Sequence, residues 1–225
     1  MNLINKAGRQ RMLGQRIVKS YVLLAAEAPA RSARGELSAA IWSFDRQLGE
    51  LGASADDDET RTALASSERE WQRFRALAMA PCTRVGVLAL RSAGERLLQA
   101  AEQTTAAFAK RTASAAVSLV NLAGRQRMLS QRIAKNYVLL EENYDNAATR
   151  QELTQACVDF GRALGELRAS PFNSGELRDE LGGVAVSWRF LLELVRQGVG
   201  VREQVLAAAD DILGRMERIT SLYQQ

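Results

Sequence analysis

The sequence contains no histidine, and it is poor in the other residues that build metal sites and disulfide frameworks. Without histidine, the chain lacks the commonest general base and the commonest protein ligand for zinc, copper or iron. Its two cysteines, Cys82 and Cys157, stand in no CxxC spacing, so they indicate small packing residues. No nucleophile motif is present either. The sequence therefore predicts no enzyme, no metal and no cofactor.

Prolines, aromatic residues and long apolar runs are also scarce. The 225 residues include three prolines, and aromatic side chains make up 6% of them. No apolar run approaches the roughly 20 residues that a membrane-spanning helix needs. Alanine, leucine, arginine, glutamine and glutamate are abundant, and these residues lose little conformational entropy in a helix. The composition predicts an all-α protein without membrane insertion.

Acidic residues are missing from one stretch, INKAGRQRMLGQRIVKSYVLL, which begins at Ile4. Its cations are Lys6, Arg9, Arg11, Arg16 and Lys19. The net charge of +4 is compatible with a nucleic acid, an anionic membrane or a small anion. Basic residues are spread over several faces, and the stretch has no aromatic residue for stacking apart from its tyrosine. These features argue against a nucleic-acid partner.

The same stretch recurs as VNLAGRQRMLSQRIAKNYVLL, at an offset of 116 residues from Ile4 to Val120. The similarity continues more faintly, because Phe44 falls on Phe160 and Trp71 lies one residue out of register with Trp188. Self-similarity at so long a period predicts two copies of one structural unit. We place the two modules at residues 1–111 and 112–225.

Prolines, glycines and the polar run ASADDD mark similar helix ends in both copies. The predicted helices of the first copy run from the N-terminus to about 27 and then over 35–51, 58–80 and 83–110. Those of the second copy cover 114–144, 147–168, 174–197 and 201–222. Each set predicts an up-and-down four-helix bundle. We expect the two bundles to pack as a pseudo-two-fold dimer through their first helices.

A heptad seam on each first helix has apolar ends and a polar middle. It reads Ile4, Gly8, Arg11, Gln15, Val18 and Val22 in the first copy and Val120, Gly124, Arg127, Gln131, Ala134 and Val138 in the second. Glycine inside a helix costs about 1 kcal/mol relative to alanine, so its repetition indicates that something approaches the backbone closely. The alternative is a small residue tolerated at a tight helix crossing. A second stripe of Leu13, Ile17, Tyr21 and Leu24 can face the helix's own bundle.

If the two seams meet, Arg11 confronts Arg127. Two desolvated guanidiniums repel each other and lose several kcal/mol of hydration each, and an anion between them reverses the balance. Arginine donors suit planar oxyanions. On this interpretation the ligand is the counter-charge that the stretch lacks. We assign Arg9, Arg16 and Lys19, with their counterparts, to a solvated face; Asn5 and Asn121 either bond near the site or face water.

The segments INKAGRQRML and VNLAGRQRML, each followed one residue later by Gln-Arg, resemble the opening motif of the PilJ-type sensor domain. This domain occurs in type IV pilus methyl-accepting chemotaxis transducers and in nitrate/nitrite sensor histidine kinases. The resemblance implies a periplasmic four-helix bundle. It also implies that nitrate binds between the first helices of two subunits, through an arginine from each and the backbone around a glycine.

By position, the ligand arginines fall on Arg11 and Arg127 and the glycines on Gly8 and Gly124. The neighbouring polar residues complete the candidate site: Asn5, Asn121, Gln15 and Gln131. This chain departs from the pattern by carrying two modules, which suggests a covalently fused sensor dimer. The link AKRTAS contains no glycine or proline, however. The alternative is that the fourth and fifth helices form one rod and each seam pairs with its copy in a second chain.

The predicted function is therefore that of an extracytoplasmic sensor or ligand-binding protein for a small oxyanion, nitrate or nitrite. We expect a periplasmic location after removal of a signal peptide, or a cytoplasmic one if Met1 is the encoded start. The expected partners are the anion and a membrane sensor, transporter or regulatory protein, with the chain a monomeric pseudo-dimer or a homodimer. The alternative is a helical interaction or oligomerisation module without a small-molecule ligand.

Overall fold

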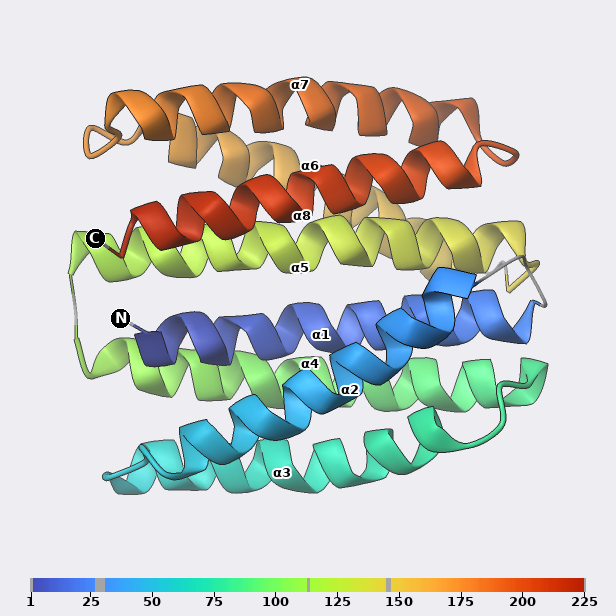
Figure 1. Ribbon diagram of the computed structural model, residues 1–225, viewed down its shortest axis with the longest axis horizontal. Helices are drawn as coiled ribbons and strands as arrows, with labels where there is room; N and C mark the ends of the chain where they lie inside the picture. The colour runs from blue at the N-terminus through green and yellow to red at the C-terminus, as the bar shows by residue number, and fades with distance from the viewer. Residues whose placement is uncertain (1, 27–30, 113, 145–146, 225) are drawn as a thin grey trace. The chain divides into compact units, whose positions relative to one another are not determined.

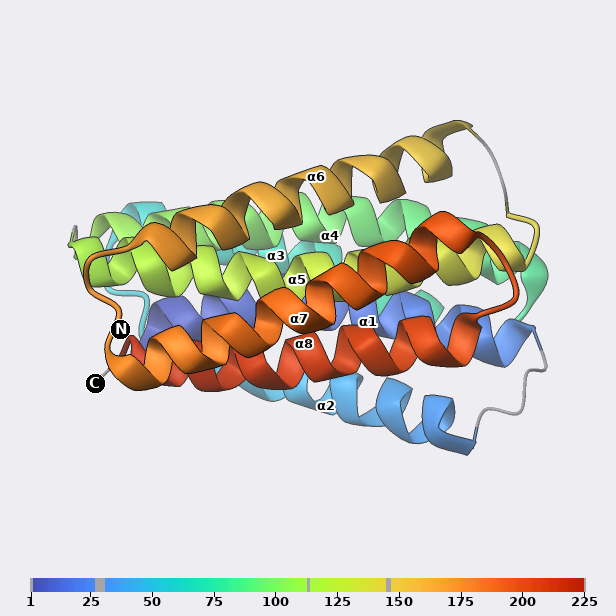
Figure 2. The same cartoon turned by 90° about the horizontal axis from the view of Figure 1, so that it is seen from above.

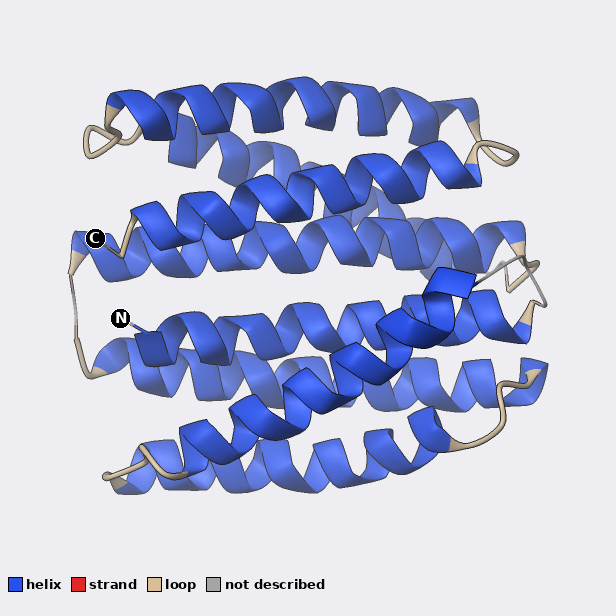
Figure 3. Ribbon diagram, viewed as in Figure 1, coloured by secondary structure: helices blue, strands red, loops and turns tan. Residues whose placement is uncertain are grey.

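The computed structural model describes residues 2–26, 31–112, 114–144 and 147–224, and over these ranges it consists of helices, turns and loops without a strand (Figures 1 and 3). The first four helices are α1 (Asn2–Ala25), α2 (Arg31–Gly52), α3 (Asp58–Met79) and α4 (Arg84–Lys110). The next four are α5 (Ala115–Glu141), α6 (Ala147–Ala169), α7 (Gly175–Gln197) and α8 (Arg202–Leu222). The all-α prediction, with two tandem four-helix bundles, is confirmed.

The predicted helix ends agree with the structure to within a few residues. The largest differences are at the start of α2, which begins at Arg31 instead of Gly35, and at the end of α5. There the helix ends at Glu141 because Asn143 adopts a φ of 57°, in the left-handed region that interrupts a helix. The predicted end of the first helix at Glu27 lies outside the described residues.

The chain divides into two compact units, Met1–Asn121 and Leu122–Gln225, so the first turns of α5 are grouped with the first unit. In that unit α1 packs against α2 and α4, and α3 packs along α4 (Figure 1). Its core includes Phe44 of α2, which stacks on Trp71 of α3 with the ring centroids 3.8 Å apart. Leu13, Ile17 and Tyr21 are buried, as expected of a stripe that faces its own bundle.

In the second unit α7 packs along α8 and also contacts α6 (Figures 1 and 2). Side chains of α5 donate hydrogen bonds to both α6 and α8. Gln126 Nε2 donates to the carbonyl of Phe160 on α6 at 3.0 Å, and Gln131 Nε2 donates to Asp210 Oδ1 on α8 at 3.0 Å. Phe160 and Trp188 repeat the aromatic pair of the first unit, with the ring centroids 4.4 Å apart. The one-residue shift in register therefore leaves this part of the core intact.

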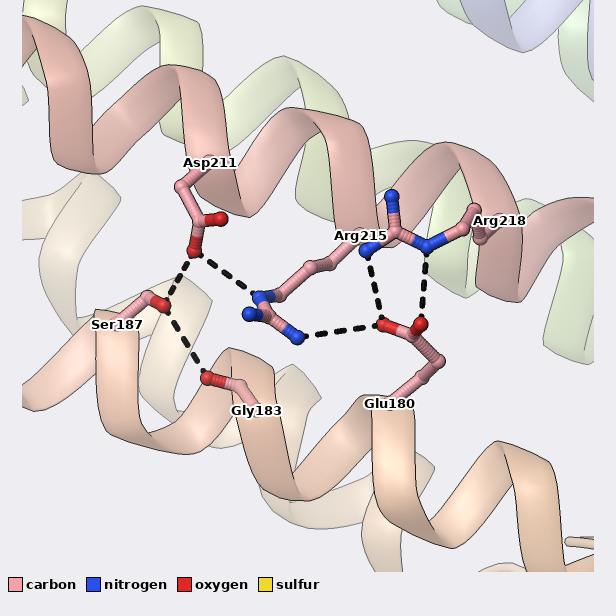
Figure 4. Close-up of polar contacts among 6 residues, drawn as sticks. All are labelled: Glu180, Gly183, Ser187, Asp211, Arg215 and Arg218. Atoms are coloured by element: carbon pink, nitrogen blue, oxygen red, sulfur yellow. Dashed lines mark hydrogen bonds and ion pairs between the residues drawn. The ribbon is translucent and has the colours of Figure 1, made fainter.

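A polar cluster joins α7 to α8 (Figure 4). Glu180 accepts hydrogen bonds from Arg218 Nε at 2.9 Å and from Arg215 Nη1 at 3.5 Å. Asp211 accepts from Arg215 Nε at 3.0 Å and from the Ser187 hydroxyl at 2.5 Å. A Cβ at Gly183 would lie 2.3 Å from Arg215 Nη1, so the bare backbone of α7 makes room for this guanidinium.

This cluster predicts a contribution to stability that depends on pH. The hydrogen bond from Arg218, aided by the charges of Arg218 and Arg215, holds the pKa of Glu180 below its ordinary value of 4.5. A carboxylate with a lowered folded-state pKa stabilises the fold above its unfolded pKa, and this stabilisation disappears as the pH falls through the folded value. We expect Glu180→Gln to lower the melting temperature slightly at pH 7. Between about pH 5 and 3 its melting temperature should then fall less than that of the wild type.

The measurement is thermal unfolding by circular dichroism at pH 7, 5, 4 and 3. Glu193→Gln, at an exposed position of the same helix, is the control and should follow the wild-type curve. Curves for Glu180→Gln that run parallel to the wild type over the whole range would contradict the prediction.

Candidate functional site

Cations of the acid-free stretch lie beside carboxylates that α2 supplies. Lys6 Nζ lies 2.7 Å from Glu50 Oε2, and Lys19 Nζ lies 3.5 Å from Glu36 Oε2. Arg16 Nε is 3.6 Å from the same Glu36 oxygen. The prediction of a solvated face was wrong for Lys19, which is 1% exposed. A heptad analysis of one helix could not show this, because the counter-charge comes from the next helix.

The second copy repeats the arrangement. Lys135 Nζ and Arg132 Nη2 lie 3.7 and 3.6 Å from Glu152 Oε2, and Lys135 is 1% exposed. Glu36 and Glu152 are separated by the same 116-residue offset as the two motifs. That coincidence was the sequence signal that could have revealed the pairs. These cations therefore tie the first helix of each module to the second.

The tyrosine of the motif also has a structural role. Tyr21 Oη donates to the carbonyl of Pro81 at 2.8 Å, in the connection between α3 and α4. Tyr137 Oη donates in the same way to the carbonyl of Gly198 at 2.6 Å, between α7 and α8. A Cβ at Gly86 would lie 2.2 Å from Tyr21 Oη, so glycine is needed at the start of α4 to admit the phenol.

Arg11 is buried, with 5% of its surface exposed, and it folds back along its own helix. Its Nε donates to the carbonyl of Gly8 at 3.4 Å, and its Nη2 donates to Oδ1 of Asn121 at 2.9 Å. Arg11 and Asn121 both belong to the first unit. A Cβ at Gly8 would lie 3.2 Å from Arg11 Nη2. The group that approaches the Gly8 backbone closely is therefore the guanidinium one turn further on.

The matching residues of the second unit are buried as well. Arg127 is 2% exposed, and Gly124, which precedes it by three residues, is also buried. Gln131 is buried and binds Asp210, which brings a carboxylate of α8 to this part of α5. In the first unit Gln15 is buried and Asn5 is half-buried, as is Asn121. The middle of the predicted seam thus contains a buried arginine and a buried glutamine in each unit, between apolar ends.

Within the described parts of the chain, histidine, cysteine, aspartate and glutamate form no group of three that could hold a metal ion. The same ranges contain no helix with the length and apolar character needed to cross a bilayer. What the first seam offers chemically is a guanidinium shielded from water that donates to the peptide backbone and to an amide side chain. The second seam has an equally buried arginine, and its Gln131 is bound to the carboxylate of Asp210. Such a site can bind a small anion through hydrogen bonds, and it has no group placed for covalent chemistry.

The family model described as the type IV pili methyl-accepting chemotaxis transducer N-terminal domain, PilJ, matches the chain twice, over residues 2–105 and 108–213. The chain therefore belongs to this family of sensor domains, as a tandem duplication. The family is a non-catalytic one that serves signal transduction. A search of the curated proteins and a search of the solved structures found no match.

Proposed function

We propose that the chain is an anion sensor that binds nitrate or nitrite through Arg11 and Arg127. The observation that carries the proposal is the repeated burial of an arginine at the same motif position of both units. A buried guanidinium loses several kcal/mol of hydration, and a bound oxyanion offsets this loss with charge-assisted hydrogen bonds. Gly8 and Gly124, Asn5 and Asn121, and Gln15 and Gln131 are the proposed surroundings of the ligand.

The proposal includes two modules, 1–111 and 112–225, whose arginines share one anion. The other arrangement is that each seam pairs with its copy in a second chain. The proposed location is the periplasm. The proposed partner, which would recognise the anion-bound form of the chain, is a membrane sensor, transporter or regulatory protein. The number of anions bound per chain, together with the mass of the particle, separates the two arrangements.

The test is isothermal titration calorimetry with sodium nitrate, sodium nitrite and sodium chloride, with the mass measured by light scattering on the same sample. We expect saturable binding of nitrate or nitrite by the wild type. Arg11→Gln and Arg127→Gln should each weaken it at least tenfold, because the loss of a charge-assisted hydrogen bond corresponds to about 1.5 kcal/mol or more. Arg9→Gln and Arg125→Gln, two residues earlier on the same helices, are the matched controls and should bind as the wild type does.

One anion per monomeric chain supports the shared site, and one anion per chain in a dimer supports pairing between chains. Binding that survives in both Arg11→Gln and Arg127→Gln would refute the arginine site. Circular dichroism of each variant shows whether its helices are retained, so loss of binding is not confused with loss of structure.

A second candidate function is a helical interaction module without a small ligand. It is favoured by the contacts within each bundle, because the lysine and the tyrosine of the repeated motif have structural roles. In that case none of the three anions changes the melting temperature, and the mass measured by light scattering rises with protein concentration.

A further inference from the structure

The second unit contains a cavity of about 570 Å³ that the seam does not involve. It lies among the C-terminal end of α5, the first half of α6 and the end of α7. Its apolar lining includes Leu140, Leu153, Leu192 and Val195. A cavity of this volume, lined mostly by apolar side chains with a few polar groups, has the ordinary features of a small-molecule site.

The charged part of the lining is cationic. Arg150 of α6 and Arg196 of α7 both line the cavity, and among its described lining residues none is acidic. A ligand that packs against the apolar side chains and also pairs with the arginines needs an apolar body and one anionic head. Guanidinium groups bind planar carboxylates in a bidentate manner, which favours a carboxylate as that head.

We propose that this cavity binds a medium-chain alkyl carboxylate, with its chain among the leucine and valine side chains and its carboxylate at Arg150 and Arg196. The cavity is partly open to solvent, and Arg150 and Arg196 are both exposed, so the carboxylate stays at its mouth while the alkyl chain fills the apolar volume. The site lies in the second unit alone and is independent of the anion site proposed above.

The first unit provides a natural comparison, because the duplication places larger residues at two of the matching positions. Ile41 and Trp42 correspond to Cys157 and Val158, which line the cavity in the second unit. When α3 and α7 are aligned on their tryptophans, Met79 of α3 corresponds to Arg196 of α7. The second unit therefore differs from its copy in having both the smaller side chains and the second arginine.

The first experiment is calorimetric titration of the whole chain with sodium octanoate at pH 7, with 1-octanol and sodium acetate as comparison ligands. We expect saturable octanoate binding at one molecule per chain, and at least tenfold weaker binding of the two comparison ligands. Arg150→Gln and Arg196→Gln should each reduce octanoate affinity about tenfold, the loss expected for a charge-assisted hydrogen bond at a partly exposed arginine. Arg189→Gln, an exposed position of α7 outside the cavity, should bind as the wild type does.

A second variant tests the location. Val158→Trp copies the residue of the first unit at a position that is 58% exposed, so the core of the bundle is not disturbed. We expect it to fold normally and to lose octanoate binding at least tenfold. Octanoate binding that is unchanged in Val158→Trp, or equally strong in both arginine variants, would overturn the proposal.

The labelling rate of Cys157, which lines the cavity, measures whether the cavity is occupied without any substitution in its lining. In a Cys82→Ser background Cys157 is the remaining thiol, and burial raises its pKa to about 11, so its reaction with a maleimide is slow. Saturating octanoate should slow the labelling of Cys157 several-fold, and an unchanged rate would count against the site. Arg11→Gln should retain octanoate binding, because Arg11 does not line this cavity. Failure of the nitrate proposal can therefore be distinguished from failure of this one.

Discussion

Phe44→Ala is expected to lower the free energy of unfolding of the first unit by about 4 kcal/mol, in the range found for large-to-small changes of buried aromatic residues. Phe44 is completely buried and lies nearly parallel to Trp71, with an interplanar angle of 12°. Its removal loses both the apolar burial and the stacking contact, and the rigid bundle cannot close the cavity. Urea unfolding followed by far-ultraviolet circular dichroism measures the change.

The matched control is Trp42→Ala on the same helix. Trp42 is 62% exposed, so its removal should change the free energy of unfolding by less than about 0.5 kcal/mol. Phe160→Ala repeats the test in the second unit, where the phenylalanine is also completely buried against a tryptophan. If Phe44→Ala cost less than Trp42→Ala, the aromatic pair would not be a main support of the core.

Glu36→Leu is expected to cost about 3 kcal/mol, because it removes a counter-charge from a buried lysine. Glu36 faces Lys19 and Arg16 and also accepts a hydrogen bond from Ser20 at 3.4 Å. The ammonium of Lys19 has little access to water, so the lost interaction is not replaced by hydration. The same urea unfolding experiment measures the loss.

Glu50→Leu is the control for this prediction. Its partner Lys6 has 30% of its side-chain surface exposed, and pairs of this kind contribute less than about 1 kcal/mol. The double variant Lys19→Met with Glu36→Leu should recover much of the stability lost in Glu36→Leu alone, since it removes both members of the buried pair. Equal losses in Glu36→Leu and Glu50→Leu would show that burial of the lysine is unimportant.

The helices could be predicted from the sequence because their signals are local. Pro81, the ASADDD run and the glycines at 198 and 200 mark the ends of helices, and the structure places Gly198 and Gly200 at positive φ after α7. The duplication then gave each assignment a second, independent reading. The end of α5 was predicted less well, since asparagine in the left-handed conformation is a weaker signal than glycine.

The partners of the motif residues could not be predicted in the same way. The polar middle of the seam and the close approach at Gly8 follow from the spacing of one helix, and the contact with Arg11 agrees with them. The pairing of Lys19 with Glu36 and the bond from Tyr21 to Pro81 depend on how other helices pack against α1. The cavity near Arg196 also depends on side-chain volumes contributed by three helices, which no single-helix pattern contains.

The tyrosine bond at the end of α1 restricts how that helix can move within its bundle. A slide along the helix axis by one residue is about 1.5 Å, which exceeds the range of about 0.5 Å over which hydrogen-bond distances vary. Such a slide would have to disrupt the bond from Tyr21 to the α3–α4 connection and the Lys19–Glu36 pair together. Tilting of α1 about its C-terminal end leaves both in place. The same two restraints recur on α5, so the C-terminal half of the first helix is held against sliding in each unit.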